Sequence, residues 1–349
     1  MGRSYVITGG AGFIGSNLVH SILEAEADAA VTVLDRLTYA GNRENLASFD
    51  GDPRMTFLEG DVCDLSLVRE VLSSAEPDVI FHLAAESHVD RSIDGPGAFV
   101  RTNVEGTYAM LEATRAFLTE RPREGFRFVH VSTDEVFGSL GPTGAFGPAS
   151  PYAPRSPYAA SKAAADHLVR AWLHTFGVPT IVTNCSNNYG PRQYPEKLLP
   201  LMILQAVEGK PLPVYGDGGH VRDWLHVDDH CAGLRLVSER GVPGETYLFG
   251  GHGERTNLEL VRAVCAILDA RLPSARPRSG LITFVADRPG HDRRYAIDAS
   301  QTERALGWRP RIGLDEGLAR TVDWYLENRA WSDRIAYRRE RLGLGGSTR

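Results

Sequence analysis

The stretch VITGGAGFIGSNL, residues 6–18, decides the fold. Gly9, Gly12 and Gly15 follow one another at intervals of three, after the apolar run Tyr5–Thr8 and before the periodic apolar stretch Phe13–Glu24. Glycines placed between a strand and a helix permit a tight turn and a close approach of the main chain to a phosphate group. The helix start adds free N–H groups and a positive dipole. The stretch therefore predicts a dinucleotide-binding strand–turn–helix unit.

Short apolar runs alternate with longer helical patterns along the first half of the chain. The residues predict strands at 5–8, 31–34, 55–58, 79–83, 126–131 and 180–183, and helices at 13–24, 65–72, 97–118 and 157–176. Such alternation is typical of an α/β protein with helices on both faces of a parallel sheet. We expect a Rossmann-type, doubly wound parallel sheet whose strands are buried on both sides.

The pattern becomes irregular after about residue 190, where prolines and glycines are frequent. We expect a smaller, mixed C-terminal domain over the carboxyl edge of the sheet. The predicted first domain is 1–190, with 223–254 returning to it, and the second is 191–222 and 255–330. Residues 272–280 read as an exposed loop, 331–349 as a C-terminal tail, and GLGGSTR (343–349) within it as disordered.

Composition excludes several classes of protein. The 349 residues carry a net charge of -6, with a pI near 6.0, which argues against nucleic-acid and membrane partners. No apolar run has the length of a bilayer span, and the N-terminus has no signal-peptide pattern. Cys63, Cys185, Cys231 and Cys265 are widely separated, which favours reduced thiols and a cytoplasmic location. No group of ligand-type residues has a spacing that predicts a metal site.

Acidic residues after the predicted strands indicate which cofactor is bound. Asp35 lies 20 residues beyond Gly15, where a carboxylate accepts hydrogen bonds from the adenosine ribose. Since a carboxylate repels a 2′-phosphate, we expect NAD rather than NADP, although Arg36 is adjacent. Asp61 and Val62 follow the third strand, near the adenine. Further on, Ala84 and Ala85 end a strand with side chains small enough to let the cofactor approach the backbone.

Tyr158 and Lys162 are one helical turn apart in SPYAASK (156–162), after the predicted N-cap Ser156 and first helical residue Pro157. They share a face of the helix, and a nearby ammonium favours phenolate. We therefore expect Lys162 to lower the pKa of Tyr158, which makes this tyrosine a candidate base.

Two adjacent acids, Asp134 and Glu135, follow the strand before that helix, in STDEVFGSL (132–140). Strand alternation sends neighbours to opposite faces. The two acids therefore reach one substrate only if strand geometry ends there.

Eight stretches together resemble one family. They are TGGAGFIGS, LTYAGNRENL, AAESHVDRSI, STDEVFG, SPYAASKA, NCSNNYGPRQYPEKLLPL, VYGDGGHVRDWLHVDDH and DRPGHDRRYAID, and they span about residues 5–327. The chain resembles the extended short-chain dehydrogenases/reductases and, among them, the dTDP-glucose 4,6-dehydratases.

The resemblance implies a reaction at a nucleotide sugar. Tyr158 would take the C4 hydroxyl proton while NAD+ accepts the C4 hydride, Lys162 would hold the nicotinamide ribose, and Thr133 would bond the C4 oxygen. Glu135 would remove the C5 proton, Asp134, kept protonated by its surroundings, would protonate the departing C6 hydroxyl, and the hydride would return to C6.

The resemblance also implies binding residues. Those expected at NAD are Gly9, Gly12, Phe13, Ile14, Gly15, Asp35, Asp61, Val62, Ala84, Ala85, Thr102, Tyr158, Lys162 and Asn188. Those expected at dTDP-glucose are Ser87, Thr133, Asn187, Lys197, Leu198, Pro213, Tyr215, Arg222, Asn257, Arg288, His291 and Tyr295, mostly in the second domain. A homodimer through the helices around 97–118 and 157–176 is implied too. Gly147 stands where the family usually has an acid.

Three alternatives share parts of this pattern. A UDP-sugar 4-epimerase needs the glycines, Asp35, Tyr158 and Lys162 but no acid pair, and a UDP-glucuronate decarboxylase needs a cation for the carboxylate instead of Asp134. A non-catalytic NAD sensor or scaffold often lacks the tyrosine or the lysine. Fold alone does not separate these functions, so the acid pair decides among them.

Overall fold

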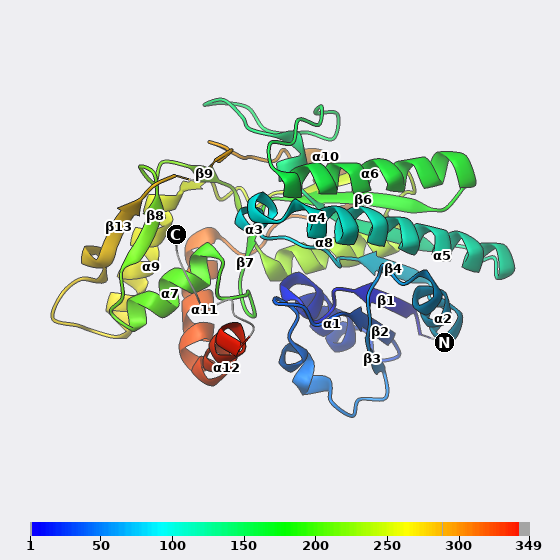
Figure 1. Ribbon diagram of the computed structural model, residues 1–349, viewed down its shortest axis with the longest axis horizontal. Helices are drawn as coiled ribbons and strands as arrows, with labels where there is room; N and C mark the ends of the chain where they lie inside the picture. Colours follow the sequence, from blue (N-terminus) through cyan, green and yellow to red (C-terminus); the bar gives the residue numbers. More distant parts are fainter. Residues whose placement is uncertain (1, 288, 342–349) are drawn as a thin grey trace.

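A seven-stranded parallel sheet forms the centre of the chain in the computed structural model, which describes residues 2–287 and 289–341 (Figure 1). In spatial order its strands are β3 (Met55–Glu59), β2 (Ala30–Asp35), β1 (Ser4–Thr8), β4 (Val79–His82), β5 (Arg127–Thr133), β6 (Thr180–Cys185) and β11 (Thr246–Phe249). Every neighbouring pair is parallel. The strand order reverses between β1 and β4, which confirms the predicted doubly wound, Rossmann-type α/β fold.

Helices cover both faces of the sheet. On one face α1 (Phe13–Ala25) packs beside α8 (Val227–Arg240), and on the other lie α2 (Leu65–Ala75), α5 (Gly106–Glu120) and α6 (Pro157–Phe176). Along β1, Ile7 packs in the hydrophobic core on the side of α1 and α8, and Val6 packs in the core on the side of α2, α5 and α6. Both are fully buried, because successive side chains point to opposite faces and each face is covered.

A second lobe with its own core lies beside the sheet (Figure 1). Its helices are α7 (Leu198–Val207), α9 (Asn257–Arg271), α11 (Leu314–Glu327) and α12 (Arg329–Arg341). Short strand pairs complete it: β8 (Leu212–Tyr215) with β13 (Ile282–Val285), β9 (Val221–Arg222) with β12 (Arg255–Thr256), and β10 (Trp224–His226) with β7 (Asn187–Tyr189). Between β10 and β12 the chain returns to the large sheet through α8 and β11.

Short helical segments make up most of the rest. They are η1 (Arg43–Phe49), α3 (Val89–Asp94), η3 (Asp134–Phe137), η4 (Arg278–Leu281) and α10 (Ser300–Leu306). Within the described ranges, no helix combines the length and the apolar character that crossing a membrane requires.

The structure differs from the sequence prediction at two helices. The predicted helix 97–118 is a run of three segments, α4 (Pro96–Phe99), the π-helical η2 (Val100–Glu105) and α5. Residues 331–341, assigned to a tail, belong to α12, where Trp331 packs against Trp324. The predicted disordered end, 343–349, and the predicted substrate residue Arg288 lie outside the described residues.

Candidate active site

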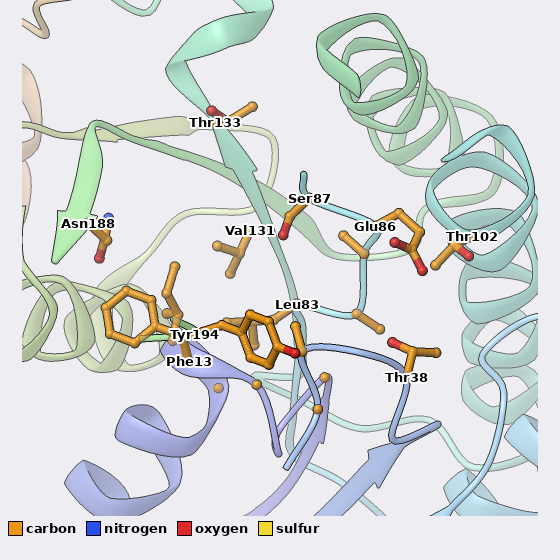
Figure 2. A pocket seen from close by; sticks show the side chains of 18 of the residues that line it. Phe13, Thr38, Leu83, Glu86, Ser87, Thr102, Val131, Thr133, Asn188 and Tyr194 are labelled. Carbon is orange, nitrogen blue, oxygen red and sulfur yellow. The ribbon is translucent and has the colours of Figure 1, made fainter. Parts of the chain in front are cut away.

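A cavity of about 310 Å³ lies where the carboxyl ends of β1, β2, β4, β5 and β6 meet (Figure 2). In open α/β sheets this edge, at the point where the strand order reverses, is the usual ligand site. All of the residues predicted to contact the cofactor line this cavity, and so do all those predicted to be catalytic: Gly9, Gly12, Phe13, Ile14, Gly15, Asp35, Asp61, Val62, Ala84, Ala85, Thr102, Thr133, Asp134, Glu135, Tyr158, Lys162 and Asn188.

The glycine turn forms the floor of the cavity. Gly9 has φ +69°, and a Cβ there would lie 2.8 Å from the Ala84 nitrogen, so the backbone that follows β4 passes directly beside the turn. A Cβ on Gly15 would lie 2.2 Å from the Gly9 carbonyl oxygen. Among the described residues, no side chain caps α1 at Gly12. Its first N–H groups are therefore available to an anion.

Asp35 and Asp61 define the far end of the cavity. The Asp35 carboxylate accepts hydrogen bonds from the Ala11 and Leu37 amides, at 2.9 and 2.8 Å. Arg36 points its guanidinium at Asp61, with Nη1 3.1 Å from Oδ2. The adjacent arginine is thus engaged by a carboxylate, which removes the reason to expect it at a 2′-phosphate.

The acid pair occupies the end of β5. The strand ends at Thr133 and the 3₁₀ turn η3 begins at Asp134, with the Thr133 hydroxyl accepting from the Glu135 amide at 3.2 Å. The chain therefore leaves strand geometry where the prediction required it, and both acids line one cavity.

The surroundings of Asp134 favour its protonated form. Burial, and then the charges of Glu135 and Asp223, hold the pKa of Asp134 well above its usual value, with Arg222 opposing them. Among the described residues, its buried Oδ2 has no hydrogen-bond partner. This oxygen is thus available to donate a proton to a ligand.

Tyr158 and Lys162 lie on α6, which begins as predicted: Ser156 Oγ accepts from the Ala159 amide at 3.1 Å, and Pro157 is the first helical residue. Lys162 is buried and donates to the Val131 carbonyl oxygen at 2.9 Å. Burial, followed by the charge of Glu135, raises the pKa of Tyr158 well above its usual value. The predicted lowering is therefore wrong, because the loss of water on burial and the charge of Glu135 raise the pKa of Tyr158 instead.

The predicted substrate residues fall into three groups. Ser87, Thr133, Asn187 and Lys197 line the cavity, and Lys197 Nζ donates to the Ser87 carbonyl oxygen at 3.0 Å. Leu198, Pro213, Tyr215, Arg222 and Asn257 lie on elements of the second lobe. His291 stacks on His220, and Tyr295, whose amide donates to the Val221 carbonyl oxygen at 3.2 Å, packs its ring into the core of the large sheet. Arg222 stacks over the Tyr295 ring at 4.3 Å and influences the pKa of Asp134, so this part of the lobe adjoins the acid pair.

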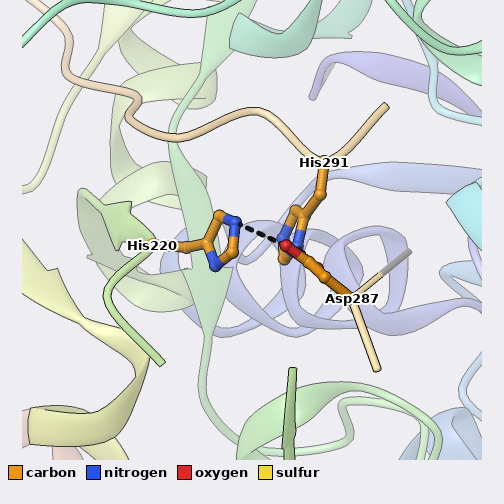
Figure 3. Close-up of side chains that lie close together, drawn as sticks. All are labelled: His220, Asp287 and His291. Atoms are coloured by element: carbon orange, nitrogen blue, oxygen red, sulfur yellow. Dashed lines mark hydrogen bonds and ion pairs between the residues drawn. The ribbon is translucent and has the colours of Figure 1, made fainter. Parts of the chain in front are cut away.

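His291 belongs to a cluster with His220 and Asp287 (Figure 3). Asp287 lies 2.6 Å from His291 Nδ1 and 3.2 Å from His220 Nε2. The two imidazoles stack face to face, with ring centroids 3.7 Å apart and an angle of 15° between the planes. In-plane lone pairs of parallel rings do not converge on one point, so we assign no metal to this cluster.

Several lining residues were not predicted. Tyr194 lies beside Phe13, Leu83 and Val131 lie in the middle of the view, and Thr38 and Glu86 lie on the side of Thr102 (Figure 2). Tyr39, Cys185, Ser186, Gln193 and Glu196 also belong to this group. Most lie inside stretches that resemble the family, such as LTYAGNRENL, and position beside a glycine turn or a strand end is the signal that would have found them.

Comparisons with known proteins agree with this geometry. The model of the family described as GDP-mannose 4,6 dehydratase matches residues 6–321. A dTDP-glucose 4,6-dehydratase of Xanthomonas campestris is 55% identical, over 97% of this chain and 99% of the relative. The structure of a dTDP-glucose 4,6-dehydratase from Streptomyces venezuelae, determined with NAD bound, superposes with a TM-score of 0.87 at 48% identity, covering 95% of this chain and 99% of the other. A UDP-glucose 4-epimerase from Thermotoga maritima reaches a TM-score of 0.82 at 26% identity, covering 93% and 99%.

The sheet, the glycine turn and the Tyr158–Lys162 pair define an extended short-chain dehydrogenase/reductase. The acid pair favours a dehydratase over an epimerase within this class, because the reaction of an epimerase needs no such pair. With relatives more than half identical over nearly the whole length, the chain belongs to the dTDP-glucose 4,6-dehydratase family.

Proposed function

We propose that this chain converts dTDP-glucose into dTDP-4-keto-6-deoxyglucose, with NAD as its resident cofactor. The observation that carries the proposal is the placement of Asp134 and Glu135 in the same cavity as Tyr158 and Lys162. Oxidation alone needs only the last two. Removal of water needs, in addition, one carboxyl group that stays protonated and a second one that is ionised. Asp134, whose pKa burial raises, and its neighbour Glu135 meet this need.

The residues present fit NAD. The uncapped start of α1 suits a pyrophosphate, and the Asp35 carboxylate suits ribose hydroxyls while disfavouring a 2′-phosphate. Asp61 and Val62 would contact adenine, and Thr102 and Asn188 also line the cavity. When bound, NAD+ supplies a hydride acceptor and donor and a positive charge.

The first step uses α6 and β5. Thr133 orients the C4 hydroxyl, and Tyr158 accepts its proton as the C4–H bond is oxidised. Lys162, held by the Val131 carbonyl oxygen, supplies positive charge from a buried position and holds the nicotinamide ribose. Since burial raises the pKa of Tyr158, this step depends on cationic charge that ligands bring to the site.

The second step uses the acid pair. The new ketone at C4 acidifies the C5 proton, which Glu135 removes, and Asp134 gives its proton to the C6 hydroxyl, which leaves as water. When the hydride has returned to C6, Glu135 gives its proton back to C5. The proton that Tyr158 took from the C4 hydroxyl then replaces the one that Asp134 gave up, so the sum is loss of one water from the sugar with no net change in the cofactor or the protein.

The second lobe is proposed to hold the sugar nucleotide, and the sheet with α8 and β11 to hold the cofactor. Arg222 is suited to a diphosphate, being buried with Nη2 donating to the Asp292 carbonyl oxygen at 2.9 Å. Asn187 and Asn257 each have a buried side-chain oxygen without a partner in the described residues, suited to a ligand N–H or hydroxyl. Ser87, Lys197, Leu198, Pro213, Tyr215, His291, Tyr295 and, from the resemblance, Arg288 complete the proposed set.

We also propose a homodimer, formed through the face of η2, α5 and α6. Val100, Tyr108 and Phe176 are large apolar side chains that are about half exposed on these helices. Tyr108 and Phe176 both contact the Trp172 ring and so form one patch, and contiguous apolar patches mark protein–protein interfaces. Tyr108→Glu should shift the mass measured by light scattering from two chains to one. A cytoplasmic location is proposed from the four unpaired cysteines.

A panel of nucleotide sugars tests the function. Purified protein with dTDP-glucose should give a product lighter by one water, with the alkali-induced absorbance of a 4-keto-6-deoxy sugar. Turnover of UDP- or CDP-glucose but not dTDP-glucose would keep the mechanism and reject the nucleotide. Formation of an isobaric epimer from any of them would overturn the dehydratase assignment.

A further inference from the structure

Asp166 lies on α6 one turn beyond Lys162, which is itself one turn beyond Tyr158, so the three share one stripe of the helix. Asp166 is fully buried and does not belong to the cavity lining. A buried carboxylate is costly unless several groups compensate its charge. Its neighbours therefore indicate why the position carries an acid.

Two strands, α6 itself and the segment that precedes α6 supply those neighbours. Asp166 Oδ2 accepts hydrogen bonds from Ser132 Oγ on β5 and from the Tyr152 hydroxyl, at 2.9 and 2.8 Å. Arg170 Nη2 donates to the same Tyr152 hydroxyl at 2.9 Å. Asn184 on β6 is a weaker neighbour at 3.5 Å. Burial alone would raise the pKa of Asp166, but His130, Lys162 and Tyr152 bring that pKa below its usual value, so the group is ionised.

His130 lies between this carboxylate and the catalytic lysine. Its Nε2 is 3.2 Å from Asp166 Oδ1 and 3.5 Å from Lys162 Nζ. Burial, followed by the charge of Lys162, lowers the pKa of His130 to about 4, so the ring is neutral near pH 7. The neutral ring contributes no charge, which leaves Asp166 to act on Lys162 as an anion.

The titratable groups around the Lys162 ammonium come from four elements: His82 on β4, His130 on β5, Cys185 on β6, and Tyr158 and Asp166 on α6. Burial lowers the pKa of Lys162 to about 8, and among the groups that oppose this Asp166 is the largest. Cys185 also opposes it, but burial raises the pKa of that thiol, which is neutral near pH 7.

We propose that Asp166 is a positioning residue: it is the counter-charge, placed behind the active site, that keeps the buried Lys162 ammonium protonated. It touches neither substrate nor cofactor and acts through Lys162. A merely structural Asp166 would tie α6 to β5 without changing how Lys162 titrates, and this difference can be measured directly.

The lysine content of this chain makes the measurement simple. The sequence has only three lysines, Lys162, Lys197 and Lys210. Protein labelled with ¹³C at lysine Cε gives three signals, which Lys162→Met and Lys210→Met assign. We expect Asp166→Asn to raise the acid dissociation constant of Lys162 at least tenfold, and Asp166→Glu to keep it near that of the unmodified protein.

Asp229→Asn is the matched control. Asp229 is another buried aspartate, and its Oδ2 accepts from the Arg311 and Ile312 amides, away from the cavity. This variant should lower thermal stability but leave the Lys162 titration unchanged. If Asp166→Asn is insoluble, Asp166→Ser, which leaves room for water, is the second neutral variant. An unchanged Lys162 titration in either soluble variant overturns the proposal.

The activity measurement rests on the proposed function. In the activity assay with dTDP-glucose, the alkaline limb of the kcat/KM profile of Asp166→Asn should move to lower pH by the same amount as the Lys162 titration. The profile of Asp229→Asn should not move. If the unmodified protein turns over no nucleotide sugar, the proposed function fails, and the lysine titration still decides on Asp166.

Discussion

Asp134 and Glu135 follow one another in the chain, yet both line one cavity, because β5 ends at Thr133 and a 3₁₀ turn begins with Asp134. In a continued strand one of them would face away. The turn also buries Asp134 while Glu135 stays partly accessible. Burial raises the pKa of Asp134, so two residues of the same chemistry acquire different roles from a change of backbone direction.

Glu135→Gln should therefore stop the reaction after oxidation. The amide cannot remove the C5 proton, so product formation should fall by about 10²- to 10⁴-fold. Tyr158 and Lys162 remain, so the near-ultraviolet absorbance of reduced nicotinamide should appear when dTDP-glucose is added. Incorporation of solvent deuterium at C5 should be lost. Normal product formation by this variant would remove Glu135 as the base.

Asp61→Asn should relax the preference for NAD. The carboxylate of Asp61 holds Arg36, and the amide would release it, since Nη1 and Oδ2 are 3.1 Å apart. Arg36 is more than half exposed, and an exposed ion pair is worth about 0–1 kcal/mol, so the affinity ratio of NADP to NAD should rise by up to about fivefold. Reconstitution of cofactor-free protein with mixtures of the two measures the ratio. Asp52→Asn, which frees Arg54 outside the cavity, is the control, and an equal ratio in both variants would contradict the role given to Asp61.

The sequence was informative where function depends on local geometry. The glycines, Asp35, Tyr158 and Lys162 follow from spacing along one strand or helix, and all of them line the cavity. The acid pair could be recognised, but the 3₁₀ turn that makes it usable could only be stated as a requirement.

Several properties of the site depend on contacts between elements, and these could not be predicted from the sequence. The sign of the Tyr158 pKa shift depends on burial by several elements, and the compensation of Asp166 comes from β5, from Tyr152 and from within α6. The π-helical segment η2, which carries Thr102, shows the same apolar pattern as an ordinary helix. No periodicity in one segment encodes these relationships.

Gly138→Ala should damage the acid pair through the backbone. Gly138 ends η3 with φ +84° and ψ −147°, a region essentially restricted to glycine, at a cost of about 1–3 kcal/mol for other residues. A Cβ there would lie 2.5 Å from the Ala153 carbonyl oxygen, so η3 must move as well. Activity should fall together with thermal stability.

Gly51→Ala is the control for that experiment. Gly51 has the same φ of +84°, but its added Cβ meets nothing within 4 Å among the described residues. It should cost about 1–2 kcal/mol of stability from conformation alone and leave turnover unchanged. Equal loss of turnover in the two variants would show that Gly138 matters only for general stability.

Lys162→Met should change how stability depends on pH. The pKa of Lys162 is lowered from 10.5 to about 8 in the folded chain, so between these pH values the unfolded chain binds more protons than the folded chain. Stability from this group therefore rises with pH across that window, by about 3 kcal/mol in total, because burying the charged form is unfavourable and the charge is lost.

Urea unfolding at pH 7 and pH 10 measures this effect. Between these two pH values, the free energy of unfolding of the unmodified protein should increase relative to that of Lys162→Met by most of that amount. Lys210 is exposed, so Lys210→Met should show a nearly constant difference. A constant difference for Lys162→Met as well would mean that Lys162 keeps an ordinary pKa despite its burial, and that Asp166 and its neighbours compensate the charge completely.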